Sequence, residues 1–450
     1  MKIKEAVRRA AAMLKGEAPK VKKPLGIIGA NVQRIDVLDK VTGRASYAAD
    51  LKLEGMLYAR VLRSPHAHAR ILSIDTTKAE KLPGVAAVLT AKDIPGEKLV
   101  GMGKEMPVLA IDKACQLGDP VAVVAADTSE TARKALALIK VDYQPLEAVF
   151  DPLIALREDA PQIHPKGNVM ATRRIVKGDI AKGFREADVI VENTYTTPSY
   201  AHACMEPEAG ISYLDEEGRV TVSIPTQGPH SIQKEIAAVL GVETDRVRVI
   251  PATVGGGFGG RGEVSIHYLL PLLTQKLRKP VKMVYTRRES FENTSKCPSF
   301  HIRYKMGATK EGKLTAVQVE IIINGGAYFF GAPVVLARAS IHATGPYYVP
   351  NILVNSKVVY TNTPYGGQMR GFGVPQVALA HESQIELIAN RLGIDPWQIR
   401  FMNGLRSGSK SSIGQVLGKG VAMRKTLEAV KPYYDKAVSL VRSQDGSSPV

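Results

Sequence analysis

The chain has 450 residues, of which 45% are hydrophobic and 23% are charged, and its formal net charge at pH 7 is +17. Such a length and composition are typical of a globular protein with two or three domains. No uninterrupted apolar run is long enough to span a bilayer. The cysteines, Cys115, Cys204 and Cys297, are too widely spaced to indicate a disulfide framework, a zinc ribbon or a cysteine-ligated iron–sulfur cluster. We therefore expect a reducing, cytoplasmic location.

Lysine and arginine are dense in residues 1–24, which we interpret as a basic N-terminal extension that suits an acidic partner subunit. Its apolar part is short and interrupted by charges, which argues against a secretory signal. Glu5 and Glu17 argue against a mitochondrial targeting segment. Elsewhere the basic residues are scattered among acids without an aromatic-interleaved stripe, so we expect no nucleic-acid binding.

Residues 25–150 read as a first domain in which short strands and helices alternate. Within it, Val121–Ala125 is an apolar run that predicts a buried strand. Ser129–Leu138 predicts a helix that is capped by Thr128 or Ser129. Residues 151–175 are rich in proline and glycine and predict a linker.

Residues 176–442 read as a second domain of mixed strands and helices. An alternating run at Val189–Tyr195 predicts a strand near its start. Residues 381–403 predict helix, broken near Gly393. The polar end of the chain, residues 443–450, predicts a disordered tail.

A glycine-rich segment is the most informative part of the second domain. Five of the six positions 255–260 are glycine, and the sixth is Phe258. The run Arg246–Ile250 before it predicts a strand, and apolar residues at helical spacing from Ile266 to Leu277 predict a helix after it. Glycine lets the backbone approach a ligand closely. Exposed N–H groups in such a turn form a concavity that suits an anion or a metal-bound oxygen.

Two other interpretations of this segment remain open. Gly255, Gly257 and Gly260 match the G-x-G-x-x-G pattern of a dinucleotide-binding fold, which makes an NAD(P)-dependent dehydrogenase the alternative function. That fold expects an acidic residue at the end of the next strand, whereas the predicted strand Val281–Tyr285 is followed by Thr286–Arg288. The second possibility is a tight turn that only joins a strand to a helix.

Three segments together resemble the xanthine dehydrogenase and aldehyde oxidase family. Thr361–Gln376 resembles its T-N-x-P-x-x-G-A-F-R-G-F-G-x-P-Q segment, Thr253–Glu263 its G-G-G-F-G-G-K loop, and Thr226–Gln227 its T-Q motif, in the family's order. Residues 43–70 resemble its small α/β hammerhead domain. The resemblance covers nearly the whole chain. It implies an α/β (α+β) fold, with a hammerhead domain followed by the first part of the molybdopterin-binding domain.

The resemblance implies a molybdenum–molybdopterin cofactor, of the cytosine dinucleotide form, to which the protein gives no direct metal ligand. Gln227 matches the glutamine that hydrogen-bonds an oxo ligand of the metal, although a polar helix-cap residue is the alternative. Phe258 matches the residue whose backbone N–H approaches the metal, between Gly257 and Gly259. Arg370 matches an arginine that contacts the cofactor, and a planar guanidinium suits such an anionic group.

Three further residues are predicted to contact the substrate. Phe372 matches an aromatic residue that packs against the substrate ring, with plain core packing as the alternative. Arg338 falls where purine-oxidising members place an arginine that stabilises charge on the heterocycle. Their matching glutamate follows the glycine loop directly, but here Gly262 holds that position and Glu263 comes one residue later. The departure favours an anionic heterocycle such as nicotinate, because a carboxylate pairs with a guanidinium.

The family's catalytic base is a glutamate far toward the C-terminus of one long molybdenum subunit, and no residue after Lys431 resembles it. The chain is then either a fragment or a subunit of a naturally split enzyme, as in nicotinate-oxidising members. The split arrangement implies a second molybdopterin subunit that carries the glutamate as general base, with 2Fe-2S and FAD on iron–sulfur and flavin subunits. The expected reaction is hydroxylation of a nicotinate- or purine-like ring, or of an aldehyde, with water as oxygen donor. A non-catalytic scaffold is the remaining alternative.

Overall fold

A computed structural model describes residues 30–262 and 266–444 of the chain. It divides into two compact units, Met1–Ser46 and Tyr47–Val450. The described part of the first unit contains one short helix, α2 (Val37–Val41), in which Lys40 pairs with the N-cap residue Asp36 at 2.8 Å. The predicted basic extension, residues 1–24, lies outside the described residues.

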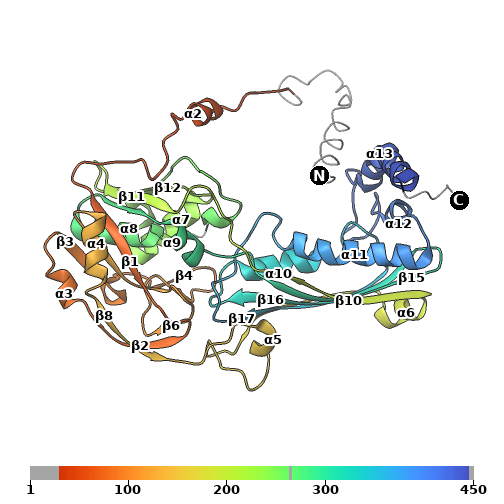
Figure 1. Cartoon of the computed structure of the whole chain (residues 1–450), viewed down its shortest axis with the longest axis horizontal. Coiled ribbons are helices and arrows are strands. Elements are labelled where there is room, and N and C mark those ends of the chain that lie inside the picture. The colour runs from red at the N-terminus through yellow and green to blue at the C-terminus, as the bar shows by residue number, and fades with distance from the viewer. Residues whose placement is uncertain (1–29, 263–265, 445–450) are drawn as a thin grey trace. The chain divides into compact units, whose positions relative to one another are not determined.

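The largest sheet of the second unit has seven strands drawn from both predicted domains (Figure 1). Its central contact is a parallel pairing of β1 with β14, in which Leu57 lies opposite Val281. The first and second predicted domains therefore share one sheet. In order across the sheet, the strands are β13 (Val247–Pro251), β12 (Val220–Ile224), β11 (Ala209–Leu214), β14 (Val281–Val284), β1 (Leu57–Arg63), β7 (Pro120–Ala126) and β3 (Val85–Leu89).

Helices pack against this sheet and bury side chains there. In α8 (Ile266–Leu277), nine residues from Ile266 to Thr274 are all buried. In α4 (Ser129–Leu136), the N-cap Thr128 accepts a hydrogen bond from the backbone N–H of Thr131 at 3.0 Å, which confirms the predicted cap. The remaining helices of this region are α3 (Thr77–Glu80), α7 (Pro229–Leu240) and α9 (Arg287–Asn293).

Two small sheets complete the part of the chain before residue 150. A three-stranded sheet has the order β6 (Lys113–Ala114), β2 (Ala69–Asp75) and β8 (Lys140–Pro145). A two-stranded hairpin joins β4 (Leu99–Val100) to β5 (Met106–Pro107).

A five-stranded sheet forms the other large layer. Two helices, α10 (Ala332–Ile341) and α11 (Val374–Leu392), run along one face of it (Figure 1). The opposite face is charged, and Arg303 donates to Glu192 across two neighbouring strands at 2.8 Å. In order, the strands are β10 (Val189–Thr197), β15 (Phe300–Ala308), β16 (Leu314–Gly326), β17 (Asn351–Tyr360) and β9 (Val169–Lys177).

The predicted linker and tail differ in detail from the structure. The range 151–175 contains α5 (Pro152–Ala155) and most of β9, because Asp151 caps the helix and β9 pairs with β17. The predicted break near Gly393 separates α11 from α12 (Pro396–Asn403). The last helix, α13 (Met423–Gln444), includes two residues of the predicted tail, and residues 445–450 lie outside the described part.

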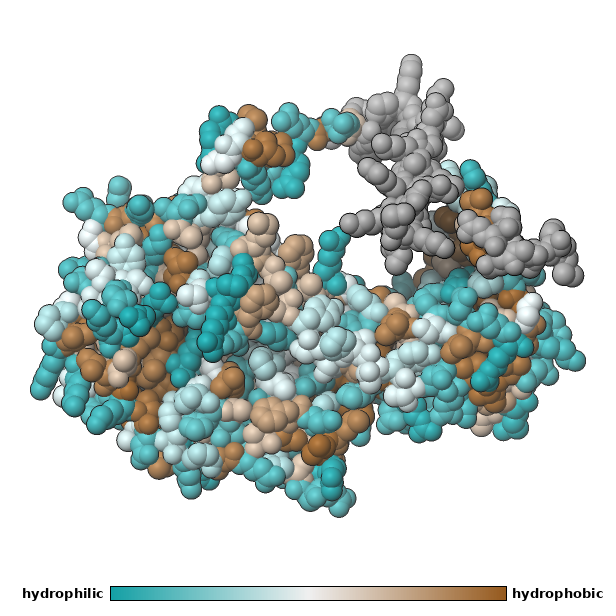
Figure 2. Space-filling model, viewed as in Figure 1, coloured by the Kyte–Doolittle hydropathy of each residue, from teal (hydrophilic) through white to brown (hydrophobic). Residues whose placement is uncertain are grey.

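Hydrophilic side chains cover most of the face shown in Figure 2, with exposed apolar residues in separate patches. Within residues 30–262 and 266–444, no helix combines the length and apolarity needed to cross a bilayer.

Candidate functional site

Two loops that are far apart in sequence meet in the structure. We call them the glycine loop (Gly255–Gly262) and the arginine loop (Gly366–Gly373). The backbone N–H of Arg370 donates to the Phe258 carbonyl at 2.9 Å. At Gly259, φ is +107°, and a Cβ there would lie 2.3 Å from the Gln368 carbonyl oxygen. Only glycine fits this contact, so the residue type fixes how closely the loops approach.

Each loop holds a phenylalanine in the left-handed region of backbone space, with φ of +54° at Phe258 and +60° at Phe372. A bulky side chain is strained there by roughly 1–3 kcal/mol. Such strain persists only where surrounding contacts impose it, and it is concentrated at functional sites. Phe258 is exposed, whereas Phe372 is partly buried and packs against the hydrophobic core.

Gln227 is oriented by the glycine loop. Its Oε1 accepts hydrogen bonds from the N–H of Gly259 at 3.1 Å and the N–H of Arg261 at 3.3 Å. The amide oxygen is thereby occupied, and the NH₂ group, which has no partner among the described residues, is available as a donor. The N-cap of α7 is Gly228, without a side-chain cap bond, so Gln227 does not cap that helix. A Cβ at Gly257 would lie 2.9 Å from the same Oε1, which explains the glycine at that position.

A buried ionic cluster joins Arg261 of the glycine loop to Glu206 and Glu208. Arg261 is 1% exposed, and its Nη1 pairs with Glu208 at 2.9 Å. Its Nε donates to the Gly256 carbonyl at 3.1 Å, and the Glu206 carboxylate accepts from the N–H of Gly255 at 2.8 Å. The cluster therefore fixes the loop at three points. Burial raises the pKa of Glu206.

This cluster was not predicted from the sequence. Two sequence features could have indicated it. One is Arg261, where the family loop has lysine, and the other is the pair of closely spaced glutamates in Glu206-Pro-Glu208.

His202 connects the two loops. Its Nε2 lies 2.8 Å from the Gln368 carbonyl oxygen, and a Cβ at Gly260 would lie 2.9 Å from its ring. Burial lowers the pKa of His202, so the ring is neutral near pH 7 and Nε2–H is the donor. Nothing in the sequence around His202 indicated this contact.

The two loops and the start of α7 enclose a cavity of about 560 Å³, which we call the loop cavity. Arg370 is exposed and is the one charged residue among its described lining. Its guanidinium has no hydrogen bond or ion pair within residues 30–262 and 266–444. The lining residues are Gln227, Gly228, Ser231, Phe258, Gly259, Gly262, Gln368, Met369, Arg370 and Phe372.

The donors of this cavity fit an anionic cofactor. They include the Gln227 amide, the Arg370 guanidinium and the N–H of Phe258, which has no partner in the described part of the chain. No described lining residue is a carboxylate. Preorganised donors without a competing acid suit a group that carries negative charge.

One predicted substrate residue, Arg338, is not brought into this lining. Arg338 is exposed on α10, whose Val335 and Ala339 pack against Gly373, and it does not line the loop cavity. Its predicted role stays a prediction. Glu263 lies outside the described residues.

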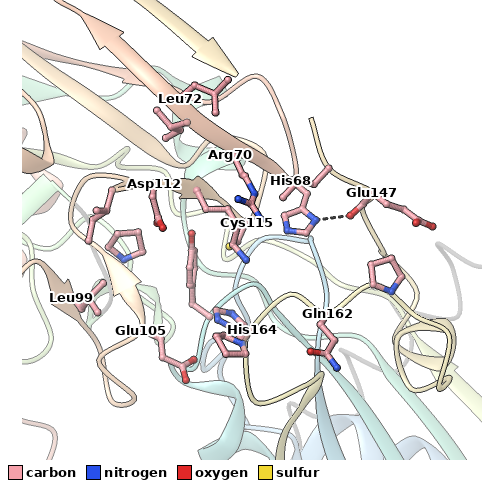
Figure 3. Close-up of a pocket in the computed structure, with 18 residues that line it drawn as sticks. His68, Arg70, Leu72, Leu99, Glu105, Asp112, Cys115, Glu147, Gln162 and His164 are labelled. Atoms are coloured by element: carbon pink, nitrogen blue, oxygen red, sulfur yellow. Dashed lines mark hydrogen bonds between the residues drawn. The ribbon is translucent and has the colours of Figure 1, made fainter. Parts of the chain in front are cut away.

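A larger cavity of about 880 Å³, which we call the His68 cavity, lies among β2, β6, the β4–β5 hairpin and residues 161–165 (Figure 3). His68 Nδ1 lies 2.5 Å from the Glu147 carbonyl oxygen, while its Nε2 is buried without a partner among the described residues. Burial lowers the pKa of His68 and raises the pKa of the Cys115 thiol to about 12. No group of three or more acidic, histidine or cysteine side chains that could hold a metal occurs in the described part of the chain.

The glycine loop does not sit in the arrangement of a dinucleotide-binding fold. Its preceding strand, β13, lies at the edge of the seven-stranded sheet. The following strand, β14, is separated from β13 by β12 and β11. A dinucleotide fold places the strand before the loop centrally, next to the strand that follows the helix. The dehydrogenase alternative therefore lacks structural support.

Two family models match the chain. Residues 163–404 match the molybdopterin cofactor-binding domain. Residues 42–147 match the a/b hammerhead domain of aldehyde oxidase and xanthine dehydrogenase.

Individual relatives agree with these matches. The nicotinate dehydrogenase large molybdopterin subunit of Eubacterium barkeri is 44% identical over 93% of this chain and 98% of its own length. A xanthine dehydrogenase molybdenum-binding subunit of Escherichia coli is 34% identical over 84% of this chain but 52% of its own length. The solved aldehyde oxidoreductase of Desulfovibrio gigas superposes with a TM-score of 0.89 at 30% identity, over 96% of this chain and 50% of that one. The chain thus spans nearly all of the first relative and about half of the other two.

Proposed function

The chain belongs to the aldehyde oxidase and xanthine dehydrogenase family, and we propose that it is the molybdopterin-binding subunit of a molybdenum hydroxylase. The observation that carries the proposal is the meeting of the glycine and arginine loops. It gathers the Gln227 amide, the Phe258 backbone and the Arg370 guanidinium at one cavity without a described carboxylate.

When bound, the molybdenum–molybdopterin cofactor supplies the redox chemistry by which oxygen from water enters the product. The residues of this chain bind the cofactor and orient it. Gln227 offers its NH₂ group because the glycine loop occupies its oxygen. Arg370 offers a planar fork of donors, and the Phe258 N–H adds a fixed backbone donor. Phe258 and Phe372 form apolar walls beside these groups.

A general base for such a hydroxylation is absent from the described lining of the loop cavity. We therefore assign the base to a glutamate on a second molybdopterin chain, as expected from the sequence. The relative from Eubacterium barkeri, which the match covers over 98% of its length, is named as a large molybdopterin subunit, and this name supports a split enzyme. Partner chains with 2Fe-2S and FAD would accept the electrons, and the cofactor would be the cytosine dinucleotide form. The three buried free cysteines fit a cytoplasmic enzyme.

The proposed substrates are nicotinate- or purine-like rings or aldehydes, with nicotinate favoured. The absence of a carboxylate from the described lining supports an anionic ring, because a buried acid would repel it. Arg338 is proposed to contact substrate charge from outside this lining, and Glu263 remains a proposed substrate residue. The domain limits 25–150 and 176–442 are also proposals, which the matched ranges 42–147 and 163–404 support.

Co-expression with and without the second molybdopterin chain tests this function. We expect the complex to contain molybdenum and to hydroxylate nicotinate, and the chain alone to contain little metal and to turn over nothing. Turnover by the isolated chain, or nicotinamide-cofactor reduction without molybdenum, would contradict the proposal.

A further inference from the structure

Gln368 has a side chain that no structural role explains. Its backbone carbonyl is engaged by His202 at 2.8 Å, but its amide has no hydrogen bond within the described ranges. The side chain lines the loop cavity. Its main-chain position is fixed, because the arginine loop is held by the Arg370–Phe258 hydrogen bond.

The amide of Gln368 lies over the open side of Gly262. A Cβ at Gly262 would have one described heavy atom within 4 Å, which is Gln368 Nε2 at 3.9 Å. Apart from the chain neighbours of Gly262, no other described protein atom lies within 4 Å of this position, and the Gln368 donor borders it. An unpaired amide at the edge of a cavity is well placed to bind a polar group of a ligand.

The remaining lining restricts which ligand fits there. Phe258, Met369 and Phe372 supply apolar and aromatic surface. The proposed function assigns Arg370, the one positive charge of the lining, to the cofactor, and no described lining residue supplies a negative charge. A flat ring with an anionic substituent fits this lining, because the ring packs on the apolar side chains and the anion accepts from the Gln368 amide.

We propose that Gln368 is a specificity-determining residue whose amide N–H donates to the carboxylate of a carboxylated heteroaromatic substrate. The inference rests on the proposed function and assigns the substrate class of the same cavity. An amide gives a charge-assisted hydrogen bond to a carboxylate and a weaker one to a neutral carboxamide. The preference of the enzyme for a carboxylate over a carboxamide substrate therefore measures the contact of the substrate with Gln368.

The experiment uses the complete complex and two probes, nicotinate and nicotinamide, which share one ring. Gln368→Glu keeps the size of the side chain and replaces the donor with a like charge. We expect kcat/KM for nicotinate to fall about 100-fold and that for nicotinamide to change less than about threefold. Calorimetric Kd values should show the same split. Gln415→Glu, on an exposed loop, is the matched control and should leave both probes unchanged.

Gln368→Met is the second variant, for the case in which Gln368→Glu fails to load molybdenum. It removes the donor without adding charge, and we expect the nicotinate-to-nicotinamide ratio of kcat/KM to fall about threefold or more. An unchanged ratio in metal-loaded variants overturns the role of Gln368. A molybdenum-loaded wild type that prefers nicotinamide to nicotinate also overturns it. A wild-type complex without molybdenum overturns the proposed function instead.

Discussion

The His68 cavity and the loop cavity differ both in the side chains that line them and in how rigidly their walls are held. The His68 cavity is the larger, at about 880 Å³, and has histidine, cysteine, acidic and basic side chains in its lining. The loop cavity is smaller, at about 560 Å³, and Arg370 is the one charged residue in its described lining. Yet the loop cavity has two phenylalanines at positive φ, tightly fitted glycines and a buried ionic cluster at Arg261 of the glycine loop. By size and number of titratable side chains, the His68 cavity is the stronger candidate for a functional site. By the preorganisation of its walls, the loop cavity is the stronger candidate.

The ionic cluster gives the largest expected contrast. Arg261→Met leaves the Glu206 and Glu208 carboxylates buried without their cation, and removing one member of a buried pair costs about 3–5 kcal/mol. Arg70→Met removes an exposed guanidinium of the His68 cavity and should change the free energy of unfolding by less than about 0.5 kcal/mol. Urea unfolding of both variants makes the comparison. Equal effects would mean that the cluster does not hold the glycine loop.

The contact between the glycine loop and the arginine loop gives the second-largest expected effect. Gly259→Ala places a Cβ 2.3 Å from a carbonyl oxygen at φ +107°, so we expect a loss of about 2 kcal/mol or more and separation of the loops. Gly414→Ala is the control, since φ is +83° there but the space is open. Thermal unfolding and molybdenum content of the purified complex should both fall further for Gly259→Ala. Identical behaviour of the two variants would show that the close approach of the loops contributes nothing.

A substitution at Arg370 tests whether the loop cavity binds the cofactor. Arg370→Lys keeps the charge and loses the planar fork of donors, so we expect molybdenum content of the complex to fall about tenfold or more. The fold should be little affected, because the side chain has no partner among the described residues. Metal analysis together with urea unfolding separates the two effects. Full metal content in the variant would show that Arg370 does not hold the cofactor.

His202 gives the smallest effect, and it depends on pH. Burial lowers the pKa of His202 in the folded chain, so the unfolded chain binds the proton more readily as pH falls below the ordinary value. The associated stability is present at neutral pH and is lost on acidification below about pH 6.5. His202→Gln can still donate to a carbonyl but does not titrate. Its free energy of unfolding should therefore decline less than that of wild type between about pH 7.5 and about pH 5.5, and parallel declines would refute the assignment.

Much of this site was predictable because it is built from contiguous segments. The run before the glycine loop predicted β13, the apolar spacing after it predicted α8, and Gln227, Phe258 and Arg370 all line one cavity as expected. The role of each in binding a cofactor stays a prediction.

What could not be predicted depends on contacts across the sequence. The Arg261–Glu208 pair joins positions 53 residues apart, and the His202–Gln368 contact joins positions 166 apart. No local pattern encodes such pairs. The shared seven-stranded sheet was missed for the same reason, because β1 and β14 pair only through the fold.

The measurement that tests the central claim most directly is an anomalous-scattering map of the purified complex, recorded at the molybdenum absorption edge. We expect the molybdenum peak at the loop cavity, beside Gln227, Phe258 and Arg370. A peak in the His68 cavity, or molybdenum bound by the complex at a place remote from both the glycine loop and the arginine loop, would contradict the proposed site.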